Sequence, residues 1–229
     1  MTQTRLLIFD FDGTLVDSEA GIVAAIAQTV RAMGFPETMI EQWRNLIGIP
    51  LTDQLRLLLD EGDYERIPAI VAYYREVYNA NVLEQTQPIP GMGALLAEVE
   101  AAGLRMVIAS SKRGGSIELI LEHLAWRHYF GAIFSPDVLT HYKPHPESVE
   151  RALAQFGLPA EAALLIGDTT FDLEMAQAGG VRSCAVTWGV HSREQLASAS
   201  PNYWADSIEQ LRDAIFSTLS FEQALHISS

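Results

Sequence analysis

The stretch that decides the fold is Leu6-Leu7-Ile8-Phe9-Asp10-Phe11-Asp12-Gly13-Thr14. Four consecutive apolar residues are typical of a strand that is covered on both faces, as in a parallel sheet. Asp10 and Asp12 are two positions apart, so extended backbone points both carboxylates to the same side. Gly13 then permits a tight turn. The stretch therefore predicts a buried strand that delivers two acids to one edge of a sheet.

Further short apolar runs predict the rest of that sheet. They lie at residues 106–109, 132–134, 163–166 and 184–186. Helical apolar spacing separates them, as at Leu95, Leu96 and Val99. Repeated alternation of strand and helix predicts the α/β class with a doubly wound parallel sheet, a Rossmann-like core.

Residues 16–87 interrupt this alternation. They contain no comparable strand run, and their apolar residues follow helical spacing, as in Ile22, Ile26 and Val30. Pro88-Ile89-Pro90-Gly91 then returns the chain to strand and helix alternation. We therefore expect an all-helical domain at 16–87, inserted after the first strand of a core domain made of 1–15 and 88–229.

The composition of the chain limits the classes of protein and of binding partner that fit it. The 229 residues are 48% hydrophobic and 19% charged, which excludes disorder as the main state. The net charge of −14 disfavours nucleic acid as a bulk ligand. Cys184 is alone, so neither an intrachain disulfide nor a cysteine-based zinc site is possible, and it is expected to be buried. With no membrane-length apolar run and no signal peptide, a cytoplasmic protein without a membrane partner is expected.

A polar residue follows each apolar run at the edge where ligands of open α/β sheets bind. These residues are Asp10, Ser110, Ser135, Asp168 and Thr187, and Asp172 follows shortly after Asp168. Helix capping explains any single aspartate about as well as a ligand site does. Helix capping is a weaker explanation for four aspartates together, namely Asp10, Asp12, Asp168 and Asp172.

Electrostatics indicates what four such acids require. Two carboxylates about 4 Å apart repel by roughly 4 kcal/mol at an effective dielectric constant of 20. The cluster therefore needs a cation or raised pKa values. Oxygen-only ligation with open positions suits Mg²⁺, which also binds substrate phosphate. One carboxylate could then attack phosphorus, while a second, kept protonated, serves the leaving group.

The two lysines of the chain lie in segments that suit a phosphate. Ser110-Ser111-Lys112 precedes a helical stretch, so hydroxyl and backbone N–H groups could cradle phosphate, although an ordinary helix cap is the common alternative. In Lys143-Pro144-His145-Pro146 the prolines restrict the backbone on both sides. Lys143 could neutralise phosphate or simply be exposed, and His145 is expected to face solvent.

Taken in order, Asp10-Phe11-Asp12-Gly13-Thr14-Leu15-Val16-Asp17-Ser18, Ser110, Lys143-Pro144 and Gly167-Asp168 with Asp172 resemble the motifs of the haloacid dehalogenase superfamily of phosphohydrolases. The resemblance spans nearly the whole chain. The helical insert is similar to the small cap of that superfamily. Pro90-Gly91 and Thr187-Trp188-Gly189 most resemble its phosphoglycolate phosphatase-like branch.

The resemblance implies a role for each matching residue. Asp10 would be the nucleophile that forms an aspartyl-phosphate, and Asp12 would be the general acid and base. Ser110, Ser111 and Lys143 would bind the phosphoryl group, and Lys143 would also hold the nucleophile.

The same resemblance implies a metal site. Asp10, the backbone carbonyl of Asp12, and Asp168 would bind Mg²⁺. Asp172 would lie beside these ligands without binding the metal itself, and would orient Lys143 or a metal-bound water. The implied activity is a Mg²⁺-dependent phosphatase for a small phosphorylated metabolite such as phosphoglycolate, a sugar phosphate or a nucleotide.

Departures from related patterns separate the alternatives. Asp12 argues against dehalogenation, and the absence of any lysine before Lys112 excludes a phosphonoacetaldehyde hydrolase. A β-phosphoglucomutase-like phosphotransferase would carry a cap histidine where this chain has Ile22. A phospho-acceptor regulatory protein without turnover remains an alternative of another class, although receiver domains lack an insert of roughly 70 residues.

Overall fold

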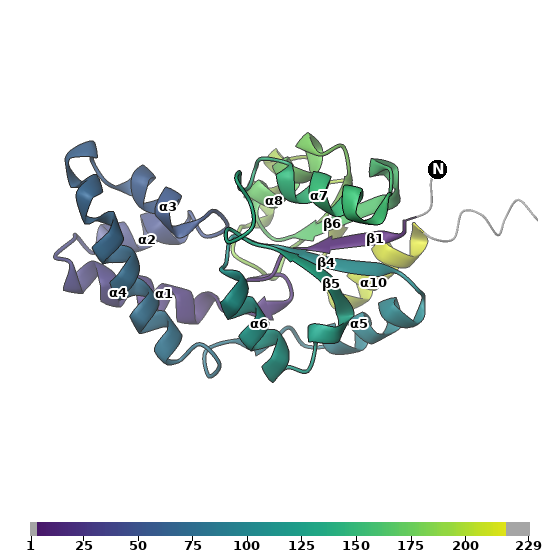
Figure 1. Ribbon diagram of the computed structural model, residues 1–229, viewed down its shortest axis with the longest axis horizontal. Helices are drawn as coiled ribbons and strands as arrows, with labels where there is room; N and C mark the ends of the chain where they lie inside the picture. Colours follow the sequence, from purple (N-terminus) through teal and green to yellow (C-terminus); the bar gives the residue numbers. More distant parts are fainter. Residues whose placement is uncertain (1–3, 219–229) are drawn as a thin grey trace, which may run out of the picture.

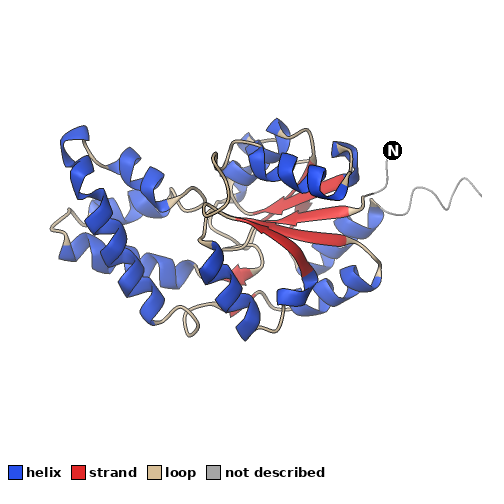
Figure 2. Ribbon diagram, viewed as in Figure 1, coloured by secondary structure: helices blue, strands red, loops and turns tan. Residues whose placement is uncertain are grey.

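The computed structural model describes residues 4–218 and has two parts. A six-stranded sheet with helices on both faces forms the core, and a group of helices extends from one end of it (Figures 1 and 2). The predicted α/β class, with a doubly wound parallel sheet and a helical insert, is confirmed.

The core sheet has the strand order β5-β4-β1-β6-β7-β8, and all its neighbouring strands are parallel. Its strands are β1 (Leu6–Phe9), β4 (Arg105–Ala109), β5 (Phe130–Phe134), β6 (Ala163–Gly167), β7 (Arg182–Val186) and β8 (Tyr203–Ala205). Phe9 lies opposite Ile108 on β4 and Ile166 on β6. The segments that follow β1, β4 and β6 therefore emerge side by side at one edge.

The two faces of the sheet are buried by different helices (Figure 2). Leu7 and Phe9 point toward the layer that holds α5 (Met92–Ala101), α6 (Gly114–His123) and α10 (Ile208–Ser217). Leu6 and Ile8 point toward α7 (Glu147–Phe156) and α8 (Thr170–Ala178). This division explains why β1 is apolar at every position.

The remaining helical elements of the core are short. They are α9 (Arg193–Ser198) and the 3₁₀ turns η2 (Arg127–Tyr129) and η3 (Ala160–Ala162). Cys184 is buried on β7, where burial raises the pKa of its thiol to about 12. Across residues 4–218, every helix is too short or too polar to cross a membrane.

The helical insert consists of α1 (Glu19–Ala32), α2 (Thr38–Arg44), α3 (Leu51–Leu58), the 3₁₀ segment η1 (Glu61–Arg66) and α4 (Ile67–Ala80). Trp43 is fully buried within it and donates its indole N–H to Gln54 Oε1 at 2.7 Å. The chain enters and leaves the insert through two paired strands, β2 (Val16–Asp17) and β3 (Gln87–Pro88). Sequence analysis predicts neither this pair nor β8.

Candidate active site

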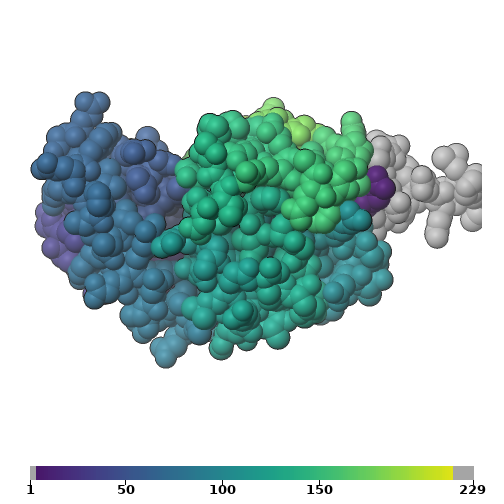
Figure 3. Space-filling view, in the orientation of Figure 1, coloured from purple at the N-terminus to yellow at the C-terminus, as the bar shows by residue number. Residues whose placement is uncertain are grey.

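A cleft lies between the helical insert and the carboxyl edge of the core sheet. Its volume is about 830 Å³, and Figure 3 shows the insert as a lobe set off from the core. The core contributes Asp10, Asp12, Ser110, Ser111 and Lys112 to its wall. The insert contributes apolar and polar groups from its loops and helices, among them Gly48, Ile49, Arg56, Tyr74 and Tyr78.

Three aspartates meet where the cleft reaches the sheet. One carboxylate oxygen from each of Asp10, Asp168 and Asp172 lies within 4.8 Å of the other two. Asp10 follows β1, Asp168 follows β6, and Asp172 lies in the first turn of α8. Parallel pairing of β1 with β6 thus brings together acids that are far apart in the sequence.

Lys143 joins two of these acids. Its Nζ lies 2.5 Å from Asp10 Oδ1 and 2.5 Å from Asp172 Oδ1, and its side chain is buried. Burial acts to lower the pKa of Lys143, but Asp10 and then Asp172 outweigh it and raise the pKa above its ordinary value. The alternative of an exposed Lys143 is therefore wrong, and the group is a buried cation beside Asp10.

One ammonium group does not balance three acids. Burial raises the pKa of Asp10 well above its usual value, against the opposing effect of Lys143. Burial, followed by repulsion from Asp172, raises the pKa of Asp168 to about 7. With all three acids ionised, the cluster would keep two uncompensated negative charges, which is the condition for binding a cation.

The surrounding polypeptide fixes the two outer acids. Asp168 accepts hydrogen bonds from Thr14 Oγ1 at 2.9 Å and from the backbone N–H of Val190 at 2.8 Å. Asp172 Oδ2 accepts from Thr169 Oγ1 at 2.7 Å and from the Thr169 backbone N–H at 3.1 Å. Each acid is thereby held in one orientation before any ligand binds.

Two glycines leave the space that Asp168 needs. A Cβ atom at Gly13 or at Gly189 would lie 2.2 Å from Asp168 Oδ2, which is well inside contact distance. Gly13 also has a φ of +79°, in the left-handed region that glycine tolerates best. The glycine after the second acid is thus needed for the turn and for the close approach of Asp168.

Asp12 lies outside the three-acid cluster. Its carboxylate accepts a hydrogen bond from Ser18 Oγ at 2.5 Å and pairs with Lys112 Nζ at 3.0 Å. Lys112 also donates to the hydroxyl of Tyr78, on α4 of the insert, at 2.7 Å. The side chain of Asp12 therefore points to the cleft and not to the cluster.

The two serines after β4 differ in what their hydroxyls contact. Ser110 Oγ accepts the backbone N–H of Lys112 at 3.2 Å and keeps its own proton to donate. Ser111 Oγ donates to the carbonyl of Gly48 in the insert at 2.7 Å, so its hydroxyl is already engaged. Of the pair, Ser110 is the better placed to receive a phosphoryl oxygen.

Ser135 and Thr187 do not join the site. Their hydroxyls bond Asp137 and Asp206 instead.

Sequence reasoning missed several residues of this site. Thr14, Lys112 and Tyr78 each contact a candidate catalytic or metal-binding acid directly or through one side chain. The signals for the first two were present, since Thr14 closes the opening acidic motif and Lys112 is one of only two lysines. Tyr78 carried no such signal, because tyrosines at helical spacing are usually packing residues.

The donor set fits Mg²⁺. Asp10 and Asp168 offer oxygen atoms only, and Mg²⁺ is usually held by one or two carboxylates while keeping waters for substrate exchange. Asp172 Oδ1 pairs with Lys143 and its Oδ2 is taken by Thr169, which suits it to orienting Lys143. The assignment of each residue to a role stays a prediction.

Comparisons with known proteins support the resemblance seen in the sequence. Residues 7–186 match the haloacid dehalogenase-like hydrolase family model. The probable phosphatase IndB of Dickeya dadantii is 34% identical, with 96% of each chain covered. Phosphoglycolate phosphatase 1 of Pseudomonas aeruginosa is 30% identical over 90% of this chain and 78% of its own. The solved structure of protein tyrosine kinase A (PtkA) from Mycobacterium tuberculosis superimposes with a TM-score of 0.75 at 28% identity, covering 94% of this chain and 99% of that one.

Proposed function

The chain belongs to the haloacid dehalogenase-like hydrolase family and is a phosphoric monoester hydrolase, and we propose that it is a Mg²⁺-dependent phosphatase acting on a small phosphorylated metabolite through an aspartyl-phosphate. The observation that carries this proposal is the buried Asp10–Lys143–Asp172 arrangement beside Asp168, open to a cleft of about 830 Å³. A carboxylate so placed can reach a phosphoryl group that enters the cleft.

In the first half of the reaction, Asp10 acts as the nucleophile. A carboxylate oxygen of Asp10 forms a bond to phosphorus while the bond from phosphorus to the leaving oxygen breaks. Lys143, 2.5 Å from Asp10 Oδ1, orients the nucleophile and offsets phosphoryl charge. Asp12 gives its proton to the leaving oxygen, which departs as an alcohol.

In the second half, water replaces Asp10 on phosphorus. Asp12, now ionised, takes a proton from the attacking water, and the bond between phosphorus and Asp10 breaks. Inorganic phosphate leaves, and Asp12 is protonated again for the next cycle. The position of Asp12 in the cleft, outside the three-acid cluster, supports this separate role.

The metal complements these residues. Bound Mg²⁺ would neutralise charge on the phosphoryl oxygens and on the Asp10 nucleophile. Asp10, Asp168 and the backbone carbonyl of Asp12 would hold it, with Asp172 keeping Lys143 in place. Ser110, and Ser111 through its backbone, would contact phosphoryl oxygens of the substrate.

We place the choice of substrate in the insert, residues 16–87, acting as a cap. Side-chain contacts join it to the core at the cleft, among them Lys112 to Tyr78 at 2.7 Å and Ser111 to the Gly48 carbonyl at 2.7 Å. Closure of such a cap excludes water and completes the site. The cleft suits a compact metabolite such as phosphoglycolate, a sugar phosphate or a nucleotide.

The test is a screen of phosphorylated metabolites with wild-type protein and Asp10→Asn, with and without EDTA. We expect phosphate release that requires Mg²⁺ and falls about a thousandfold or more in Asp10→Asn, because the amide is a poor nucleophile. Asp17→Asn is the matched control, since Asp17 lies on β2, outside the residues that line the cleft. Metal-independent release, or full activity of Asp10→Asn, would contradict the proposal.

The same screen separates hydrolysis from phosphoryl transfer. PtkA is a relative named as a tyrosine kinase, and it aligns with 92% of this chain. Adding a tyrosine peptide and ATP would reveal a transferase as labelled peptide, whereas the phosphatase releases inorganic phosphate only. Protein that keeps its phosphate without turnover would identify a phospho-acceptor regulator.

A further inference from the structure

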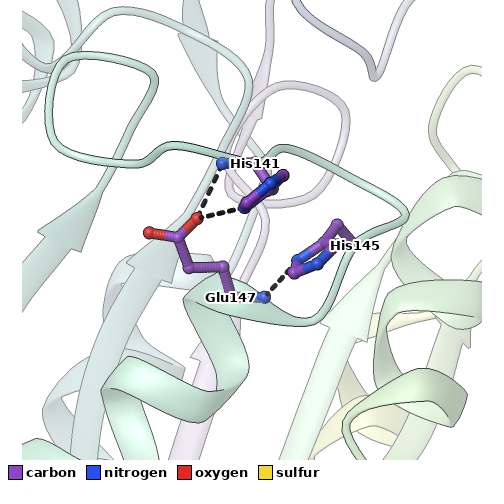
Figure 4. A group of neighbouring side chains, drawn as sticks. All are labelled: His141, His145 and Glu147. Atoms are coloured by element: carbon purple, nitrogen blue, oxygen red, sulfur yellow. Dashed lines mark hydrogen bonds and ion pairs between the residues drawn. The ribbon is translucent and has the colours of Figure 1, made fainter.

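A second group of metal-ligating side chains lies in the loop between β5 and α7 and at the first residue of α7. One ligand atom from each of His141, His145 and Glu147 lies within 4.8 Å of the other two (Figure 4). The two imidazole rings are stacked, with centroids 4.3 Å apart and planes 21° from parallel. Within residues 4–218, the aspartates of the active site form the other such group.

The polypeptide holds these side chains together without a ligand. The carboxylate of Glu147 accepts the backbone N–H of His141 at 2.6 Å and lies 3.2 Å from His141 Nδ1. The backbone N–H of Glu147 donates to His145 Nδ1 at 3.2 Å (Figure 4). The three residues thus form a network that draws both imidazoles to the start of α7.

The two imidazoles are accessible, whereas the Glu147 side chain is 14% exposed. The His141 side chain is 59% exposed, and His145 is exposed as well. Arg151, one turn further along α7, lies 3.4 Å from the other oxygen of Glu147, which leaves Oε2 facing His141. An ion can therefore reach the imidazoles from solvent without opening the core.

We propose that His141, His145 and Glu147 form a second cation site, selective for late first-row transition ions such as Zn²⁺ or Cu²⁺. Two imidazole nitrogens and one carboxylate oxygen, with water completing the shell, suit these ions, whereas Mg²⁺ prefers oxygen ligands throughout. Bonds of about 2.0–2.2 Å would draw the three ligands closer than they lie now. The ion would replace the direct contact between His141 Nδ1 and Glu147 Oε2.

The site has a structural consequence for the active site. His141 and His145 flank Lys143 by two residues on each side, so a bound ion would tie together both ends of the segment that carries the buried lysine. The two imidazoles are exposed to solvent and Lys143 points to Asp10, so the two cation sites are separate. Occupation is expected to stabilise this loop by mass action.

The proposal is tested on the full chain without a histidine tag, in excess Mg²⁺. One equivalent of Cu²⁺ is added and its electron paramagnetic resonance spectrum recorded, because imidazole nitrogens split the signal and carboxylate oxygens do not. The variants are His141→Ala/His145→Ala and the control His123→Ala/His128→Ala, whose histidines are exposed elsewhere. Calorimetry with Zn²⁺ measures affinity on the same proteins and on Glu147→Gln.

We expect nitrogen splitting in the wild type and in the control, and its loss in His141→Ala/His145→Ala. The affinity for Zn²⁺ at this site should fall at least about tenfold in that variant, and less in Glu147→Gln. A wild-type spectrum without nitrogen splitting overturns the proposal. Splitting that survives in His141→Ala/His145→Ala, or that is lost equally in the control, overturns it as well.

Discussion

At the scale of single residues, Lys143 determines the electrostatics of the active site. It is the cation that contacts both Asp10 and Asp172, each at 2.5 Å, and all three groups are buried. A buried pair adds little net stability over an apolar substitute, but removing one partner leaves an uncompensated charge, which is costly. Lys143 therefore has a structural role that can be measured separately from catalysis.

Replacing Lys143 with methionine tests this role. In EDTA at pH 8, Lys143→Met should lower the free energy of unfolding by about 3–5 kcal/mol, because Asp10 and Asp172 lose their partner. The matched control is Arg212→Met, which breaks an exposed pair with Glu98 and should cost far less, because solvent screens the two charges. Urea unfolding provides the measurement. A similar small loss in both variants would mean that Lys143 is not the partner on which these acids depend.

At the scale of elements, the turn after β1 requires glycine at one position, both for its backbone conformation and for the space beside Asp168. Gly13 adopts a φ of +79°, and its missing Cβ leaves the space occupied by Asp168 Oδ2. Gly34 has a similar φ of +74°, but a Cβ there would meet nothing within 4 Å. A substitution at Gly34 therefore tests the backbone conformation alone. A substitution at Gly13 tests the backbone conformation together with the contact to Asp168.

Alanine at the two positions should behave differently. Gly34→Ala should cost about 1–2 kcal/mol of stability from the left-handed backbone alone, with activity retained. Gly13→Ala should cost more and should lose most Mg²⁺-dependent activity, because its Cβ displaces the Asp168 carboxylate. Thermal unfolding and phosphate release provide the two measurements. Equal stability losses with equal activity would show that Asp168 tolerates the added methyl group.

At the scale of the whole molecule, the cleft couples folding to pH and to metal. The pKa of Asp168 is raised from 3.8 to about 7 by burial and then by Asp172. A raised carboxyl pKa contributes stability that is fully present below pH about 4 and is lost as pH rises through about 7. A cation that pairs with the ionised Asp168 would restore the folding stability that is lost as the pH rises.

Stability measurements with and without Mg²⁺ should show this coupling. In EDTA, the contribution of Asp168 to the free energy of unfolding should decline between pH about 4 and about 7. Mg²⁺ at about ten times its Kd should raise the Tm by about 3–6 °C at pH 8. The increment should be smaller at pH 5, where protons compete for the acids, and smaller at both pH values in Asp168→Asn. An equal increment at pH 5 and pH 8 would contradict the coupling.

The sequence was sufficient to place the central strands. All five apolar runs are strands of the parallel sheet, with ends within two residues of those expected. Continuous apolarity is a local signal, because a strand covered on both faces needs it at every position. The structure adds β8 and the β2–β3 pair, which are two or three residues long and depend on partners far along the chain. Such short strands carry no periodicity for sequence reasoning to detect.

For this protein, the sequence by itself determined the chemistry available: clustered aspartates at strand ends, two lysines, and an insert of helices. Those features follow from local spacing and residue type. Only the tertiary structure decided which groups meet: Lys143 with Asp10 and Asp172, and Lys112 with Asp12 and Tyr78. The hydroxyl of Ser111 also turned to Gly48 rather than to the phosphate site that the sequence suggested. These contacts join segments from different strands and from the insert, so packing of the folded chain sets them and local sequence does not.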